Sequence, residues 1–319
     1  MEGTSLAREY YEAFGKAMLD EQFKDVKDRI AVGVAGEGSE NFNVDDEISW
    51  DHDFEPGFCL WITKEDEREF GFKLERAYAK LPNTFKGFIR QPMNPCGGNR
   101  HGVLIIDEFY EKFIGSNRAP ESFEEWLKIP EDTLATATNG EVFEDKLGVF
   151  SGIRSKLLAM PNDVWFKKVA AKMVRMGLAG QYNYARCVGH DDNVAAQIAL
   201  ANFVEDGVKL AFLMNHEYAP YFKLAFRRMK TLKSFNDLYD RFEFLLIKDN
   251  SRENYLKKLE YIESIAKEFI DYFKENGLTQ ATCNNLDTHA YSIIDNIKDP
   301  ELRNLNIMID ELWLKGTFK

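Results

Sequence analysis

The chain of 319 residues has few cysteines and no motif that pairs them. Its four cysteines, Cys59, Cys96, Cys187 and Cys283, are widely separated, with no C-x-x-C pair and no histidine at zinc spacing. Disulfide frameworks and structural zinc sites both depend on such spacing. The sequence therefore predicts free thiols in a reducing compartment, and we expect a cytoplasmic protein.

Long apolar segments are also lacking. The N-terminal residues contain no basic stretch followed by an apolar core. No later run reaches the ~20 apolar residues that a membrane-spanning helix requires. We therefore expect neither a secretion signal nor a membrane partner.

Positive charge is in deficit, because 41 basic residues face 53 acidic ones and the formal net charge is −12. Affinity for the phosphate backbone of duplex nucleic acid comes from clustered Lys and Arg, so we do not expect a duplex binder. Two common catalytic motifs are missing as well, namely the G-x-S-x-G elbow of serine hydrolases and the G-x-x-x-x-G-K-[ST] phosphate loop. A nucleotide substrate carried by a divalent cation stays compatible with this charge.

The first informative feature that the sequence contains is a short apolar run followed by a glycine-rich turn. The β-branched residues from Ile30 to Val34 predict a buried strand. Gly36, Gly38 and Ser39 follow, and such small residues let a backbone turn sharply and approach a ligand. Backbone N–H groups and a hydroxyl at a turn of this kind can hold phosphate oxygens. We therefore interpret Gly38 and Ser39 as nucleotide-binding residues.

Two carboxylates, Asp51 and Asp53, precede a second apolar run from Phe58 to Ile62. In an extended strand alternate side chains share a face, so the two would project together while His52 points the other way. Neighbouring carboxylates close to phosphate-holding amides suit a Mg²⁺ ion that bridges to a nucleoside triphosphate, and Mn²⁺ is an alternative ion. The other interpretation is a surface hairpin whose acidic residues are only solvated.

This ordered pair of motifs resembles the signature of the polymerase-β-like nucleotidyltransferase superfamily. The longer string GEGSENFNVDDEISWDHDFEPGFCLWI also resembles a narrower bacterial group in which such a domain precedes a helical domain of unknown function. The resemblance implies a mixed β-sheet with flanking helices, and it implies that Asp51 and Asp53 are the catalytic metal ligands.

A third carboxylate lies on a later strand in that superfamily, and the sequence here matches less clearly. The run GVLII after His101 predicts a third strand, and Asp107 is the acid at its end. We take Asp107 as the candidate third catalytic carboxylate. The alternatives are that it starts the following helix or is a solvated acid.

The second half of the chain has helical periodicity almost throughout, with few glycines and prolines. We predict an α+β protein with a nucleotidyltransferase-like domain over residues 1–145 and a mostly α-helical bundle domain over 146–319. Residues 83–100 are rich in turn-forming residues and are expected to be a loop. Residues 120–148 are expected to be loop-like with short helical pieces, including FEEWL, and a last helix is expected over 301–314.

Two polar and aromatic clusters interrupt these helices. The first contains Arg186, and the second contains Tyr218, Lys223 and Arg227, of which the last two would share a helix face. The resemblance extends here: the family's patterns look like Q-Y-N-x-x-R and YAPYYK-x-x-x-R, and this chain has QYNYAR and YAPYFK followed by Arg227. We interpret these four residues as nucleotide-binding. The alternative is structural: the arginines would pair with nearby acids and the tyrosines would fill the core.

The implied reaction is attack by a hydroxyl on the α-phosphate of a nucleoside triphosphate, which transfers the nucleotide and releases pyrophosphate. The acceptor stays open. A small molecule such as an aminoglycoside suits an acidic protein, because acidic surfaces attract cations. A protein hydroxyl and a tRNA end are alternatives. A different class of function is a catalytically silent nucleotide-binding or protein-interaction module of the same fold.

Overall fold

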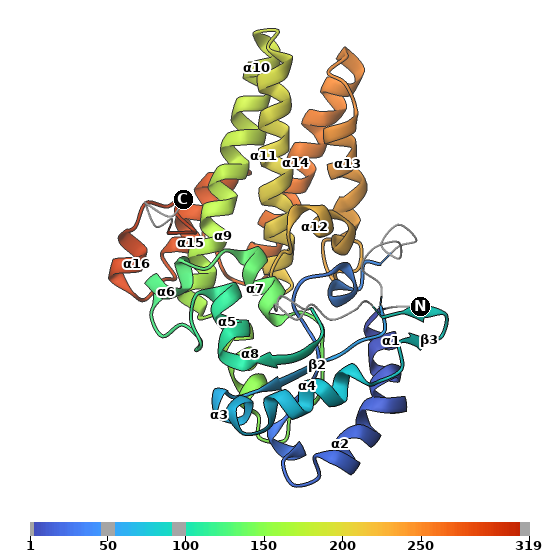
Figure 1. Cartoon of the computed structure of the whole chain (residues 1–319). Coiled ribbons are helices and arrows are strands. Elements are labelled where there is room, and N and C mark those ends of the chain that lie inside the picture. Colours follow the sequence, from blue (N-terminus) through green and yellow to red (C-terminus); the bar gives the residue numbers. More distant parts are fainter. Residues whose placement is uncertain (1–2, 46–54, 91–99, 313–319) are drawn as a thin grey trace. The chain divides into compact units, whose positions relative to one another are not determined.

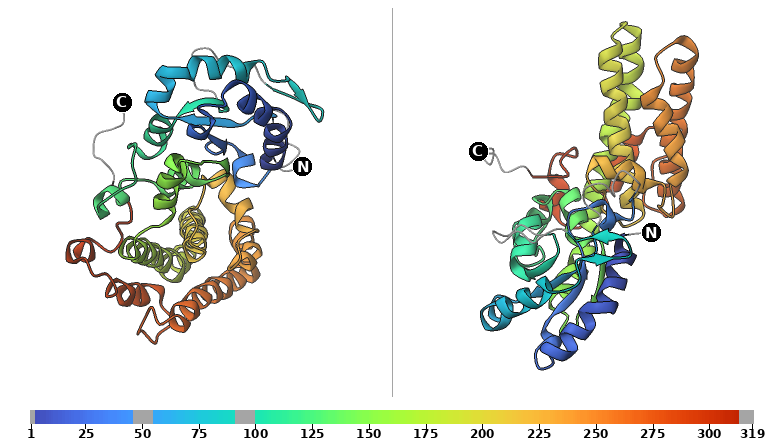
Figure 2. Two further views of the ribbon diagram at one scale, coloured as in Figure 1. Left: turned by 90° about the horizontal axis from the view of Figure 1, so that it is seen from below. Right: turned by 45° about the vertical axis from the view of Figure 1, so that its right-hand side comes forward.

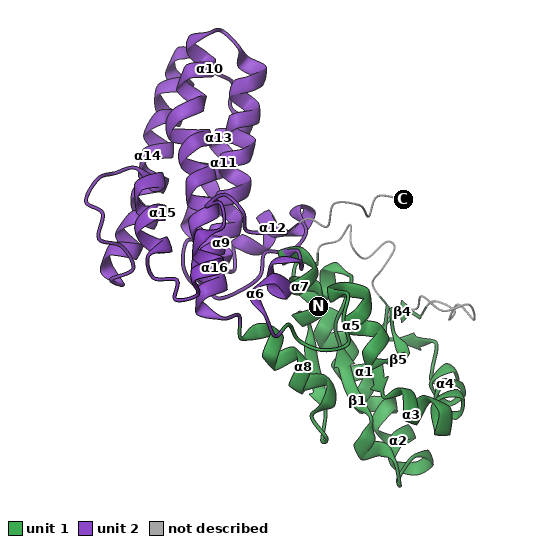
Figure 3. Cartoon of the chain, turned by 90° about the vertical axis from the view of Figure 1, so that its left-hand side faces the viewer, with its two compact units in different colours: residues 1–120, 131–159 green, residues 121–130, 160–319 purple. Residues whose placement is uncertain are grey.

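A computed structural model describes residues 3–45, 55–90 and 100–312. The chain forms two compact units, drawn in different colours in Figure 3. Unit 1 comprises residues 1–120 and 131–159, and unit 2 comprises residues 121–130 and 160–319. The chain therefore leaves unit 1, contributes ten residues to unit 2, and returns. The boundary between two domains that the sequence predicts at residue 145 remains a prediction.

Unit 1 contains a four-stranded mixed sheet in the order β5-β2-β1-β6. The central strand β1 runs antiparallel to both of its neighbours, whereas β5 is parallel to β2. A separate hairpin pairs β3 with β4. The strands are β1 (Ala31–Val34), β2 (Cys59–Ile62), β3 (Thr84–Phe85), β4 (Phe88–Ile89), β5 (Gly102–Ile105) and β6 (Glu141–Glu144).

Helices cover both faces of this sheet. On one face, Val32 and Leu60 belong to a buried apolar cluster with residues of the helices before β1 and after β2. On the other face, the Trp61 ring stacks on Phe150 with ring centroids 3.9 Å apart and meets the edge of Phe109. The helical segments of unit 1 are α1 (Gly3–Tyr10), η1 (Tyr11–Gly15), α2 (Lys16–Gln22), η2 (Lys27–Arg29), η3 (Ser39–Phe42), α3 (Lys64–Asp66), η5 (Glu67–Gly71), α4 (Phe72–Ala79), α5 (Ile106–Ile114), α7 (Glu131–Thr138) and α8 (Val149–Leu158).

Two stretches expected to be loops contain regular structure. The first, 83–100, includes the β3–β4 hairpin. The second, 120–148, has the short helical pieces that were expected, FEEWL in α6 among them, but it also includes the sheet strand β6, whose sequence EVFE carries a charge at each end. An edge strand commonly carries such charges, and they hide its apolar alternation from a sequence pattern.

Unit 2 is helical in the part that the structure describes, which confirms the expected helical C-terminal region. Its long helices α9, α11, α13 and α14 run side by side (Figures 1 and 2). The helical segments are α6 (Phe123–Leu127), α9 (Asn162–Met176), η6 (Gly177–Tyr184), α10 (Ala185–Gly189), α11 (Asn193–Met214), α12 (Phe222–Met229), η7 (Asn236–Leu238), α13 (Tyr239–Ile247), α14 (Arg252–Glu275), α15 (Leu286–Ile294) and α16 (Pro300–Asn304). No helix among the described residues is both long enough and apolar enough to cross a membrane.

The last helix among the described residues, α16, ends at Asn304 and is much shorter than the helix expected over residues 301–314. Two fully buried lysines of α9 bind backbone carbonyls of the segment that follows. Lys167 donates to the carbonyl oxygens of Leu305 and Asn306 at 2.8 and 2.9 Å, and Lys168 donates to that of Asp310 at 3.0 Å. These carbonyls bond to ammonium groups instead of to a continuing helix. Burial also lowers the pKa of Lys167 to about 8.

Candidate functional site

The glycine-rich turn of unit 1 follows directly on β1. Gly36 and Gly38 have φ angles of 108° and 124°, which L side chains rarely adopt. A Cβ atom at Gly38 would also lie 1.8 Å from Nη2 of Arg100 and 2.3 Å from a carboxylate oxygen of Glu40. Glycine is therefore required at position 38 by its conformation, and a larger residue would also displace the ends of the Arg100 and Glu40 side chains. Ser39 then begins the short 3₁₀ helix η3.

Side-chain amides fix the shape of this turn. The Asn139 amide bonds Gly36 twice, accepting from its N–H and donating to its carbonyl, both at 2.8 Å. The side-chain amide of Asn41 donates to the carbonyls of Gly36 and Glu37. The backbone carbonyl of Asn41 accepts from the N–H of Gly140. The turn is thus clamped to the segment just before β6, which rigidifies it before any ligand arrives.

The backbone N–H groups of Glu37, Gly38 and Ser39 donate no hydrogen bond within the part of the chain that the structure describes. All three residues reach the surface of unit 1. Successive N–H groups of this kind form concave sites for anions. The Ser39 hydroxyl is different, because it donates to Asp45 at 2.8 Å and would have to rotate to meet a phosphate.

A buried ion pair lies against the turn. Nη2 of Arg100 contacts the carboxylate of Glu40 and donates to the carbonyl of Glu37 at 3.0 Å. The Glu40 side chain is 8% exposed and that of Arg100 is 26% exposed. Burial raises the pKa of Glu40, and Arg100 offsets that rise only in part. Arg100 therefore brings a positive charge to the turn, a role that the sequence alone did not indicate.

Asp107 lies away from the turn. It follows the C-terminal end of β5, in the first turn of α5, where its carboxylate is 3.7 Å from Nζ of Lys64. Because β5 is parallel to β2, and β2 is antiparallel to β1, the turn after β1 is at the N-terminal end of β5. The length of the strand, roughly 13 Å at about 3.3 Å per residue, separates the two. The structure thus supports the interpretation of Asp107 as an acid at the start of a helix.

Glu141 is a carboxylate that the topology does bring near the turn. It is the first residue of β6 and lies opposite Val34, at the C-terminal end of β1. Its carboxylate pairs with Arg8 of α1, and its side chain is 46% exposed. Sequence reasoning missed Glu141 because β6 was not recognised as a strand.

The two acids at the centre of the metal-site prediction, Asp51 and Asp53, lie outside the described residues. Within the described ranges, no group of three His, Cys, Asp or Glu side chains is arranged to hold a metal ion. The Mg²⁺ prediction therefore still depends on Asp51 and Asp53.

Unit 2 holds the other four residues predicted to bind nucleotide, and it separates them into two places. Lys223 and Arg227 both lie on α12, as expected, with Tyr218 in the connection before it. Arg186 lies on α10, where its guanidinium sits over the ring of Tyr182 at 5.1 Å. The 22-residue helix α11 connects these two places, and Figure 1 shows α10 and α12 at its opposite ends.

A helix of that length spans about 33 Å at ~1.5 Å per residue. One nucleotide therefore cannot contact Arg186 and Lys223 together. Arg186 forms no ion pair with an acid among the described residues. The two acids that could have paired with it have other roles: Asp192 caps α11 through the N–H of Ala195, and Glu205 pairs with Lys209.

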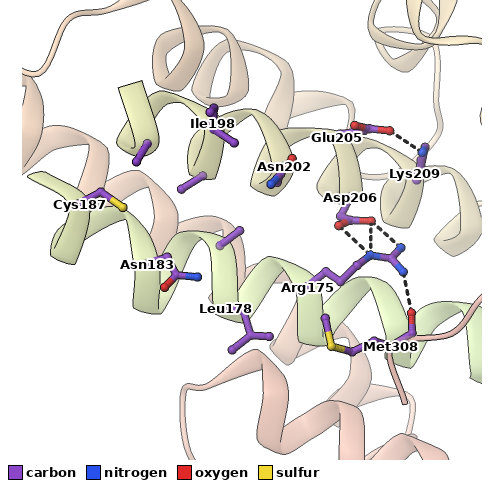
Figure 4. Close-up of a pocket in the computed structure, with 13 residues that line it drawn as sticks. Arg175, Leu178, Asn183, Cys187, Ile198, Asn202, Glu205, Asp206, Lys209 and Met308 are labelled. Carbon is purple, nitrogen blue, oxygen red and sulfur yellow. Dashed lines mark hydrogen bonds and ion pairs between the residues drawn. The ribbon is translucent and has the colours of Figure 1, made fainter. Parts of the chain in front are cut away.

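Unit 2 also contains a cavity of about 630 Å³ between α11 and the segment formed by the end of α9, η6 and α10 (Figure 4). Two ion pairs lie along it, Arg175 with Asp206 and Lys209 with Glu205. Asn183 and Asn202 supply amides, and Leu178, Ile198 and Met308 supply apolar surface. None of the four predicted nucleotide-binding residues of unit 2 lines this cavity.

Comparison with known families finds one match. Residues 126–224 match the model of a domain of unknown function, DUF4037. The match begins in α6, includes β6 and Glu141, and ends in α12 just after Lys223. It supports a domain of unknown function in the later part of the chain, and it does not reach the glycine-rich turn. No curated protein matches the chain.

Proposed function

We propose that the protein is a nucleotidyltransferase that moves a nucleoside monophosphate from a triphosphate to a hydroxyl acceptor. The observation that carries the proposal is the turn after β1. It has two glycines at positive φ, three backbone N–H groups without a partner among the described residues, and the guanidinium of Arg100 beside them. Backbone amides and a positive charge in one place suit the β- and γ-phosphates of a nucleotide.

The metal in this proposal is Mg²⁺, with Mn²⁺ as the alternative, held by Asp51 and Asp53. A bound divalent ion would supply charge neutralisation on the phosphates and orient the α-phosphate for attack. Arg100 would stabilise negative charge on the released pyrophosphate, which requires it to exchange Glu40 for a phosphate oxygen. Glu141 replaces Asp107 as the candidate third carboxylate, because it lies at the turn end of the sheet.

A silent nucleotide-binding module is the second candidate. One observation favours it: Asp107, the carboxylate expected to complete the site, lies at the other end of β5. Such a protein would bind a triphosphate at the turn without releasing pyrophosphate. The two candidates share the binding site and differ in turnover alone.

Binding is tested by thermal shift with ATP, GTP, CTP and UTP, each with and without Mg²⁺. A ligand at millimolar concentration with micromolar affinity adds about 4 kcal/mol to the free energy of unfolding. We expect one triphosphate to stabilise the protein only with Mg²⁺, and we expect Asp51→Asn with Asp53→Asn to abolish this effect. Asp107→Asn is the matched control and should leave it intact. No shift with any triphosphate would overturn both candidates.

Turnover is tested by pyrophosphate release in the presence of candidate acceptors, with an aminoglycoside as the first small molecule. Glu141→Gln should lower the rate of release much more than it lowers nucleotide affinity, because a third carboxylate acts on the reacting groups. Nucleotide binding without release for any acceptor, and without an effect of Glu141→Gln, would favour the silent module.

A further inference from the structure

Strand β5 forms one edge of the sheet in unit 1. Its inner edge pairs with β2, and no strand among the described residues pairs with its outer edge. Val103, Leu104 and Ile105 all line one cavity of about 430 Å³. Side chains alternate between the two faces of a strand, so three consecutive residues can line one cavity only where it runs along the strand's edge. The cavity therefore gives access to the unpaired backbone groups of β5.

The walls of this groove come from the helices on the two faces of the sheet. Strand β5 lies between α4 and α5 (Figure 3). The segment η5–α4 contributes Glu67, Phe72 and Glu75, and α5 contributes Glu108 and Phe113. Phe72 is 71% exposed, although it is a large apolar residue. A strand placed in the groove would direct its alternate side chains toward these two walls.

The walls carry negative charge that the protein does not neutralise. The carboxylates of Glu67, Glu75 and Glu108 are exposed, and they form no ion pair within the described ranges. The two cations that line the groove already have partners: Lys112 pairs with Glu37 at 3.0 Å, and Arg100 pairs with Glu40. The free charge of the groove is therefore negative on both walls, which favours a basic ligand.

We propose that this groove binds an extended, lysine- or arginine-rich peptide segment of a partner protein, which adds a strand to the outer edge of β5. Main-chain hydrogen bonds to β5 provide affinity in this mode of recognition, and the walls select the side chains. The carboxylates on both walls select basic residues, and the exposed Phe72 and the half-buried Phe113 offer apolar surface to the residues between them.

The inference does not rest on the transferase proposal, because docking to β5 needs no nucleotide. It does bear on that proposal, since Gly36 and Glu37 line the same groove. A docked segment would lie next to the proposed phosphate-binding turn. A small polyamine would also meet the carboxylates, but it has no peptide groups to pair with the strand edge.

The test uses the full chain without nucleotide and a fluorescein-labelled eight-residue peptide that alternates lysine and valine. Fluorescence anisotropy should show saturable binding, and a peptide that alternates glutamate and valine should not bind. Hydrogen exchange should become slower at residues 102–106 when the lysine peptide is added, because the outer amides of β5 acquire partners. Two peptides methylated on the backbone nitrogens of one or the other set of alternate residues are compared, and at least one should lose binding.

The contribution of the walls is tested with a triple variant, Glu67→Gln, Glu75→Gln and Glu108→Gln, which should weaken binding about tenfold, since each exposed pair contributes modestly. The matched control is Glu65→Gln, Glu111→Gln and Glu253→Gln, which removes three exposed carboxylates that do not line the groove. Its affinity should be unchanged.

Three results would overturn the proposal: no binding of the lysine peptide, binding without slower exchange at 102–106, or full retention of binding by both methylated peptides. Equal weakening in the two triple variants would likewise show that only overall charge matters. Since nucleotide is absent from every arm, failure here would leave the transferase proposal standing.

Discussion

Each unit contains a buried ion pair, and the two differ in how well the carboxylate is neutralised. In unit 1, Glu40 faces the single guanidinium of Arg100, and burial raises its pKa above the ordinary value. In unit 2, burial also acts to raise the pKa of Asp310, but Lys172 at 2.7 Å and Arg175 at 2.8 Å more than reverse the effect, and the pKa is lowered.

This difference suggests that the Asp310 network of unit 2 is structural, whereas Arg100 of unit 1 is available to bind a ligand. Asp310 is held by two cations, so its network ties the segment after α16 to α9. Arg100 pairs with one carboxylate, and burial raises the pKa of that carboxylate, so we expect Arg100 to change partners at a smaller cost. Two glycines at positive φ, and three backbone N–H groups that have no partner among the described residues, lie in the turn beside Arg100. Perturbed groups in that setting are candidates for function.

The largest expected effect comes from breaking the network of unit 2. Asp310→Asn removes the buried carboxylate that Lys172 and Arg175 share, and Arg175 keeps only Asp206. This should cost about 3–5 kcal/mol of unfolding free energy. Urea denaturation measures the loss. The control is Asp271→Asn, which removes an exposed partner of Lys267 and should change stability by about 0.5 kcal/mol or less. Similar losses in both variants would mean that the network contributes no more than a surface pair.

The turn of unit 1 is tested by Gly38→Ala, which we expect to cost about 2–3 kcal/mol. Two terms contribute, the positive φ and the overlap of the new methyl group with Arg100. Gly115→Ala is the comparison for a positive φ without crowding, because Gly115 has φ 70° and ψ 12° and no atom within 4 Å of the added Cβ, whereas Gly38 has φ 124° and ψ 143°. Equal losses in thermal unfolding would show that Arg100 does not press against the turn.

Lowering the pH should change the contributions of the Asp310 network and of the Glu40–Arg100 pair to folding stability in opposite directions. The lowered pKa of Asp310 means that its contribution is complete above the ordinary value of 3.8 and is lost as the pH falls below it. The raised pKa of Glu40 means that the folded state takes up a proton above the ordinary value of 4.5, so stability is gained as the pH falls toward that value.

Both pH effects can be measured by replacing one carboxylate at a time. Melting temperatures of the wild type, Asp310→Asn and Glu40→Gln between pH 7 and pH 3 measure both. In Asp310→Asn, the melting temperature should fall less below pH 3.8 than it does in the wild type. In Glu40→Gln, the rise in melting temperature as the pH falls toward 4.5 should be absent. Parallel profiles for all three proteins would contradict the comparison.

The smallest effect is expected for Glu40→Gln on nucleotide affinity. The substitution frees Arg100 from a carboxylate while keeping a hydrogen-bonding side chain, so Arg100 should bind phosphate more tightly. We expect a gain of up to about tenfold, equivalent to ~1.4 kcal/mol. Isothermal titration with Mg²⁺ and the triphosphate identified by thermal shift provides the measurement. Weaker binding by a folded Glu40→Gln variant would show that Glu40 positions Arg100 for the ligand.

Apolar runs were enough to locate β1, β2 and β5 in the sequence, because buried strands have few alternatives. They could not locate β6, since the strand's end residues, Glu141 and Glu144, are charged and its identity depends on pairing with β1. Nor could the sequence give strand direction. That direction decides whether Asp107 or Arg100 lies at the turn.

The α-helical second half was predictable from periodicity, but its exceptions came from contacts distant in sequence. Helix α16 ends early where Lys167 and Lys168 bind backbone carbonyls from more than a hundred residues away. The two polar clusters looked like one site because they are close in sequence, yet α11 holds Arg186 far from Lys223. Spacing along the chain does not set distance across a helical bundle.

Unit 1 is completed only by residues 131–159, after residues 121–130 of unit 2, and this order has a consequence for synthesis of the chain. Strand β1 is complete at Val34, but β6, its neighbour on one side, begins only at Glu141. At the ~5–20 residues per second of translation, roughly a hundred intervening residues take on the order of ten seconds. During that time a fully apolar strand has one edge unpaired, which invites association with other nascent chains. A ribosome that stalls before residue 141 would release an N-terminal unit that cannot complete its sheet.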